Sequence, residues 1–134
     1  MTKTLLIAAV AMLVLMAIAD FFWLNTATKW LYRPRIGHLL ADKPNMVAAV
    51  AFYLLYGVGV AALVLRPAVA AGSPGMALLW GAVFGLVAYG TYDLTNHATM
   101  KGWSATVTVV DMAWGTLLTG FTSAAAVWIA QKLT

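Results

Sequence analysis

The chain contains no cysteine and no glutamate, and only 9% of its 134 residues are charged. Without cysteine there is no disulfide, no thiolate metal site and no cysteine nucleophile. So little charge cannot cover the surface of a soluble domain of this length, whereas 63% of the residues are hydrophobic. The composition excludes an ordinary soluble domain and indicates a single integral membrane domain covering residues 1–134.

Nucleic-acid motifs are also absent, although the net charge is +4. The eight basic residues are divided among short connections, which makes a poor surface for following a phosphate backbone. Their distribution suits orientation in an anionic membrane better, so we expect no nucleic-acid partner.

Four apolar segments are long enough to cross a bilayer core of ~30 Å, which needs about 20 helical residues. They lie at about residues 4–25, 46–65, 75–94 and 104–130. We expect an all-α fold, a four-transmembrane-helix bundle, with Arg66-Pro67 and Ser73-Pro74 between spans. Within the third segment, GAVFG is a small-xxx-small pattern that favours close helix packing.

The N-terminal segment has the basic start and apolar run of a signal peptide. Its apolar run continues into FFWLN without a strong cleavage site, which favours a retained first span; the alternative is cleavage after Ala17 or Ala19.

The first connection, WLYRPRIGHLLADKPN, mixes apolar and basic residues. This mixture predicts an interfacial segment, partly helical, that covers one end of the bundle like a lid. Pro34 and Gly37 argue against one continuous helix there. The alternative is an ordinary basic loop at the membrane surface, in which His38 is interfacial or solvated.

Basic residues near the spans predict the orientation. One side of the membrane carries five of them, Lys29, Arg33, Arg35, Lys43 and Lys101. The other side carries Lys3, Arg66 and Lys132. The positive-inside rule places the first side in the cytoplasm and both termini in the periplasm.

All four acidic residues are aspartates, and three of them lie in or at the ends of spans. Because successive spans alternate in direction, Asp20, Asp93 and Asp111 all lie toward the side with more basic residues; Asp42 lies in the first connection, where water can reach it. A charge at membrane depth costs ~2.5–3.5 kcal/mol, so such residues usually face the bundle interior or a wet cavity. We therefore expect a polar pocket on one side of the membrane.

Polar and aromatic neighbours complete this expected pocket. Tyr89 and Tyr92 share a helix face, and the repeated pattern Asp-x-x-Trp (DFFW and DMAW) places acid and indole on one face. Either these indoles mark the membrane interface, or their N–H groups donate to carboxylates or line a ligand site. The pocket candidates are Asp20, Trp23, Tyr53, Tyr56, Tyr92, Asp93, Asn96, His97, Asp111 and Trp114.

The elements DFFWLN, WLYRPRIG, YDLTN and VDMAWG resemble a family of bacterial membrane proteins, domain of unknown function 2177. The resemblance covers nearly the whole chain. It implies a small four-span protein of the bacterial inner membrane and brings no established activity. The residues at its motif positions, none with an assigned role, are Asp20, Trp23, Tyr92, Asp93, Thr95, Asn96, Asp111, Trp114 and Gly115.

Several functions fit these residues. Three aspartates with His97 could bind a hard metal ion, but no HExxH or carboxylate-rich ExxH pattern accompanies them, so the sequence requires no metal or other cofactor. A proton relay needs polar groups at several depths, and the far half of each span offers almost none. His97 also suits a capping or hydrogen-bonding role at a helix end.

Two further functions remain. Aspartate, tyrosine and His97 could supply acid–base chemistry, with Arg33 or Arg35 contacting a phosphate head group, although no GxSxG pattern is present. The polar groups could also serve only to hold the helices together, with the acids paired to the basic first connection.

We predict a small integral membrane protein that binds a ligand or partner through a pocket on one side. The partners expected are membrane lipid, a lipophilic small molecule or a membrane protein. The alternative is an intramembrane enzyme acting on a lipid or isoprenoid by aspartate and tyrosine acid–base chemistry, so enzymatic activity stays open.

Overall fold

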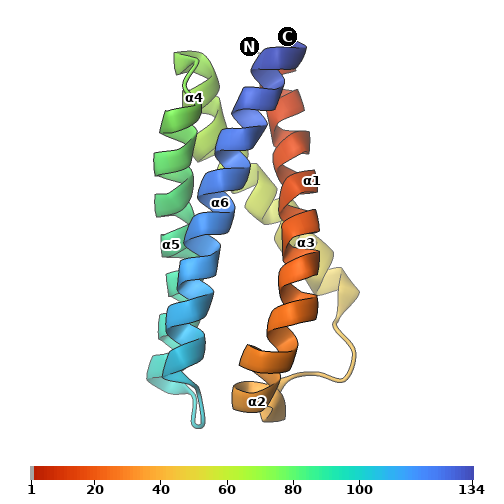
Figure 1. The fold of residues 1–134 in the computed structure, drawn as a ribbon, viewed down its shortest axis with the longest axis vertical. Helices are drawn as coiled ribbons and strands as arrows, with labels where there is room; N and C mark the ends of the chain where they lie inside the picture. Colours follow the sequence, from red (N-terminus) through yellow and green to blue (C-terminus); the bar gives the residue numbers. More distant parts are fainter. Residues whose placement is uncertain (1) are drawn as a thin grey trace.

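The computed structural model describes residues 2–134, and this range is helical without any strand. Four helical segments in it are long and apolar enough to cross a membrane: Thr2–Leu39, Met46–Ala71, Pro74–Thr99 and Ala105–Leu133. The expected all-α fold with four spans is confirmed. Both termini lie at one end of the molecule, and the side chains of Thr4 and Thr134 hydrogen bond there at 3.2 Å (Figure 1).

The first span continues well past its predicted end at residue 25. Helix α1 (Thr2–Ala27) is followed without interruption by a π-turn, η1 (Thr28–Tyr32), by α2 (Arg33–Ile36) and by a 3-10 turn, η2 (Gly37–Leu39). Pro34 lies in the first turn of α2, directly after the widened turn. A proline has no N–H and its ring crowds the preceding turn, and a local widening accommodates both effects.

The second span uses the same device. Helix α3 (Met46–Val60) is followed by a π-turn, η3 (Ala61–Leu65), and by α4 (Arg66–Ala71), in which Pro67 again lies in the first turn. Our prediction that the second span ends before Arg66-Pro67 is therefore wrong. The helix ends instead at Gly72, whose φ of 63° suits glycine because it lacks a Cβ.

The third and fourth spans begin at serine caps. The side chains of Ser73 and Ser104 accept hydrogen bonds from the N–H groups of Met76 and Val107, at 3.0 and 3.3 Å. Helix α5 (Pro74–Thr99) continues five residues beyond the predicted end at residue 94, because nothing in LTNHAT forbids a helix. Helix α6 (Ala105–Leu133) follows a short turn.

Glycines bring α5 and α6 into close contact. A Cβ built at Gly85 would collide with the Gly115 carbonyl oxygen and would lie 2.8 Å from the Thr119 hydroxyl group. A Cβ at Gly81 would lie 2.8 Å from the Thr119 carbonyl oxygen and 3.1 Å from the Gly120 Cα. The GAVFG pattern therefore packs against the backbone of α6, as small residues at membrane helix interfaces do.

The second span packs differently from the others. Helix α1 lies against α6, and α3 contacts α1, but the contacts of α5 with the second span are made mainly by η3 and α4. Helix α3 therefore packs on α1, whereas its continuation in η3 and α4 contacts both α1 and α5. This oblique course leaves α3 and α5 apart on the side of the molecule that holds α2 (Figure 1).

We expect Gly85→Ala to lower the free energy of unfolding by about 1–3 kcal/mol, because the added methyl group meets backbone that cannot move aside. Unfolding in detergent micelles measures the change. Gly75→Ala is the matched control, since its Cβ would lie 3.8 Å from the nearest atom, the Ser73 hydroxyl oxygen. Equal stabilities of the two variants would contradict close packing at Gly85.

Candidate functional site

The buried carboxyl group of Asp20, on α1, is held by two other helices. Trp114 on α6 donates its indole N–H to Asp20 Oδ1 at 3.0 Å, and the Tyr53 hydroxyl on α3 donates to Oδ2 at 2.5 Å. Both oxygens therefore have a neutral donor. Hydrogen bonds to an ionised acceptor are about twice as strong as those between neutral groups, which makes this carboxylate tolerable away from water.

Asp111, on α6, is bonded through the extension of the first span. The Tyr32 hydroxyl in η1 donates to Asp111 Oδ1 at 2.5 Å, and the Trp23 indole N–H donates to the Tyr32 hydroxyl oxygen at 2.9 Å. Trp23 therefore acts on Asp111 through Tyr32. The first connection is partly helical, as expected, and its Tyr32 donates the hydrogen bond to the buried Asp111.

The two Asp-x-x-Trp patterns are joined crosswise. Each tryptophan serves the aspartate of the other helix, directly for Trp114 and through Tyr32 for Trp23. Their indole rings stack between the two helices, with ring centroids 4.4 Å apart and planes 7° from parallel. The sequence left open whether these indoles mark the membrane interface or donate to carboxylates. Trp114 donates to the Asp20 carboxylate directly, and Trp23 donates to Tyr32, which binds Asp111.

Asp93, on α5, is fully buried and neither of its oxygens accepts a hydrogen bond from an N–H or hydroxyl group in residues 2–134. The Asp111 carboxyl group on α6 is its acidic neighbour. Asp20 and Asp111 thus have phenol or indole donors, whereas Asp93 has none in the described residues.

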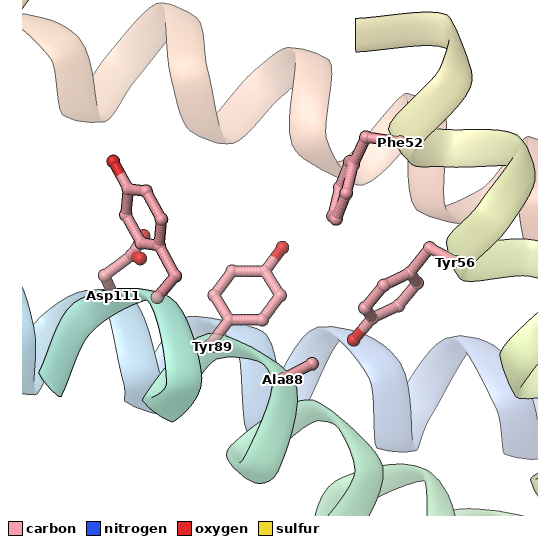
Figure 2. A pocket seen from close by; sticks show the side chains of 6 residues that line it. Phe52, Tyr56, Ala88, Tyr89 and Asp111 are labelled. Carbon is pink, nitrogen blue, oxygen red and sulfur yellow. The ribbon is translucent and has the colours of Figure 1, made fainter. Parts of the chain in front are cut away.

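A partly open cavity of about 310 Å³ lies beside this network, between α3 and α5. It is lined by Phe52, Tyr56, Ala88, Tyr89, Tyr92 and Asp111. Figure 2 shows the Tyr89 ring between Asp111 and Tyr56. At its rim, Phe52 is 46% exposed and Tyr92 57% exposed, so the cavity opens sideways on the surface of two spans.

A second cavity of about 260 Å³ lies under the extension of the first span. Tyr32 and Ile36 line it from that extension, and Trp103 lines it from the turn before α6. Tyr92 and Asp111 line both cavities, so the Asp111 carboxyl group stands where they meet.

Other candidates lie apart from this arrangement. His97 is exposed, and its Nδ1 is hydrogen bonded to the Thr108 hydroxyl at 3.2 Å rather than to Asp93. The Asn96 side chain makes no hydrogen bond within residues 2–134. Of the two roles expected for His97, metal ligation and hydrogen bonding at a helix end, the structure shows a hydrogen bond.

The expected pairing of the acids with the basic first connection is wrong. Arg33 and Arg35 are both exposed, and Arg35 donates to the Trp30 carbonyl oxygen at 2.8 Å. The donors to the acids are phenols and indoles, which are neutral and can be buried at far lower cost than a guanidinium group. No group of three or more metal-ligating side chains occurs in the described part of the chain.

Two residues of the site were missing from the pocket candidates. Tyr32 was assigned to a loop. However, the buried residues Asp20, Ala27 and Leu31 follow one another at helical spacing, and Leu31 directly precedes Tyr32, so the helix extends to this tyrosine. Tyr89 packs its ring against Gly115, where any Cβ would collide with the ring. The glycine of VDMAWG was the signal for that contact.

These features define a multi-pass membrane protein in which two buried aspartates, Asp20 and Asp111, are hydrogen bonded to tyrosines and a tryptophan. The chain belongs to the family described as "Predicted membrane protein (DUF2177)", whose model matches residues 5–128. The resemblance carried by DFFWLN, YDLTN and VDMAWG is thereby confirmed. No curated protein matches the chain. No solved structure matches it either.

We expect Tyr32→Phe to lower the free energy of unfolding by about 1–3 kcal/mol, because it leaves Asp111 Oδ1 and the Trp23 indole without their shared partner. Unfolding followed by tryptophan fluorescence measures this loss. Tyr92→Phe is the control for stability, since the Tyr92 hydroxyl makes no hydrogen bond within residues 2–134. If Tyr32→Phe lowers the free energy of unfolding no more than Tyr92→Phe does, the Tyr32 hydrogen bonds do not stabilise the fold as proposed.

Proposed function

We propose that the protein binds a lipophilic molecule in the cavity between α3 and α5. The observation that carries this proposal is the combination of aromatic walls with one carboxyl group, Asp111, in a space that opens sideways between two spans. Binding sites for small molecules are concave and mostly apolar, with a few polar groups that orient the ligand. A molecule dissolved in the bilayer can reach such an opening without crossing water.

A purely structural role accounts for Asp20 and for the bond of Asp111 to Tyr32, but not for the opening of Asp111 onto a cavity or for the buried Asp93. Both Asp20 oxygens are satisfied between helices, as a helix-fastening contact requires. Asp111 faces a cavity, and Asp93 has no donor. Unsatisfied buried polar groups are rare and expensive, and they concentrate at sites with a function.

We assign the protein to the bacterial inner membrane, with the end that holds α2 and the turn between α5 and α6 in the cytoplasm. Five of the eight basic residues lie at that end, and the positive-inside rule supports this orientation. The termini are then periplasmic. The cavity, near the cytoplasmic end, is accessible to membrane lipid or to a lipophilic small molecule; a membrane protein partner docking there is the competing occupant.

We expect Ala88→Phe to reduce the lipophilic material that purifies with the protein, because the larger ring fills the cavity. Mass spectrometry of an organic extract from equal amounts of purified protein measures the loss, with thermal unfolding as a check on folding. Leu86→Phe is the matched control, since Leu86 lies on the same helix, is 46% exposed and is not part of the cavity wall. Identical extracts from both variants would contradict binding in this cavity.

A second candidate function is intramembrane catalysis on a lipid or isoprenoid. Its support is the presence of two buried aspartates, Asp93 and Asp111, with Asp111 in a cavity wall that also contains Tyr89 and Tyr92. A protonated carboxyl next to an ionised one offers an acid and a base to a substrate in the same space.

For this second function we expect Asp93→Asn to fail in restoring the lipid composition of a deletion strain that the wild-type protein restores. Untargeted lipid mass spectrometry measures the composition, and Asp42→Asn, an exposed aspartate, is the control. If Asp93→Asn restores every lipid, the carboxyl group is not catalytic.

A further inference from the structure

The buried acids have no cation of their own. The side chains of all eight lysines and arginines are exposed, and none lines the cavity between α3 and α5. The donors to Asp20 and Asp111 are neutral phenols and indoles. The polar end of the cavity, at Asp111, is therefore negative without a compensating charge from the protein.

The cavity wall contains one carboxyl group, that of Asp111, and Asp93 is not part of the wall. One carboxyl group among aromatic rings suits a single monovalent cation better than a divalent ion, which needs six or more oxygen ligands.

The walls of the cavity favour the same sign of charge. Phe52, Tyr56, Tyr89 and Tyr92 supply four aromatic rings around a space of about 310 Å³. Aromatic faces attract cations, most of all when the site is desolvated, and rings that surround an ammonium group are a recurrent means of binding it. Tyr56 is fixed in place, because its hydroxyl is hydrogen bonded to the Thr119 hydroxyl at 2.7 Å and its ring lies 5.3 Å from that of Phe52.

We propose that the cavity binds a lipophilic organic cation, with its ammonium group at Asp111 and among the tyrosine rings, and its apolar body toward Phe52 and the lipid. This inference rests on the proposed function and names the class of its ligand. An anionic head group would meet the Asp111 carboxyl group and be repelled. A hydrated inorganic cation would find too few oxygen ligands in a wall made mostly of rings.

Benzyltrimethylammonium and neopentylbenzene test this proposal, because they differ only in a charged nitrogen that replaces a neutral carbon. Each probe is used in tritiated form, and its binding to the purified full-length protein in uncharged maltoside micelles is measured by equilibrium dialysis against empty micelles. We expect the ammonium compound to bind at least about tenfold more tightly than its carbon isostere, once partition into empty micelles is subtracted.

Two variants locate the effect. Asp111→Asn, which keeps the size of the side chain and removes its charge, is expected to lower the affinity for the ammonium compound at least about tenfold and to leave that for neopentylbenzene unchanged. Asp42→Asn makes the same chemical change at an exposed position and is expected to leave both unchanged. If Asp111→Asn does not fold, the comparison of the two probes on the wild-type protein decides alone.

The possible failures are distinguishable. Equal binding of both probes, both lost in Ala88→Phe, overturns the cationic ligand and leaves the proposed lipophilic cavity intact. If neither probe binds but Ala88→Phe still reduces the lipophilic material that purifies with the protein, the cationic ligand is likewise overturned and the lipophilic cavity is retained. Binding of neither probe, together with identical extracts from Ala88→Phe and Leu86→Phe, overturns both proposals.

Discussion

Burial of carboxyl groups without any cationic side chain beside them is the constraint on which the rest of this structure depends. A charge at membrane depth costs ~2.5–3.5 kcal/mol on insertion scales, so each acid needs partners that are themselves cheap to bury. Phenol and indole donors meet this need because they are mostly apolar and carry one polar tip. The donors to Asp20 and Asp111 come from three different spans, so that satisfying the acids fixes where those spans lie.

The length of the first span follows from the same need. Tyr32 reaches Asp111 only because the helix continues past the membrane-spanning part of α1, and Pro34 would ordinarily end it. The π-turn of η1 absorbs the proline, so that the chain stays helical and Leu31 and Ile36 pack with Val107 at the start of α6. The second span repeats this solution before Pro67, where it extends the helix to Ala71.

The sequence was sufficient for the four spans and for the placement of the aspartates on one side, because both follow from hydropathy and alternation of direction. Helix ends were less predictable, since prolines within membrane helices are tolerated when local π-turns satisfy the backbone. The crossed pairing of Trp23 and Trp114 could not be read from spacing within one helix, because it depends on how α1 packs against α6. Asn96 and His97 line neither of the two cavities beside Asp111, which the sequence could not show because polarity alone does not give the direction of a side chain.

The cavity lies where α3 and α5 are separated, whereas α5 and α6 are packed closely along their length. Glycines bring α5 onto α6, where the Tyr89 ring fits against Gly115. By contrast, nearer its start α3 reaches its neighbours through two long side chains, Tyr53 to Asp20 on α1 and Tyr56 to Thr119 on α6. The closer contacts of α3 lie further along it, where Gly57 meets Leu13 and Gly59 meets Phe84. Ala88, one of the three α5 residues that line this space, has a small side chain, so the space between α3 and α5 is not filled and the acid of α6 stays open to it.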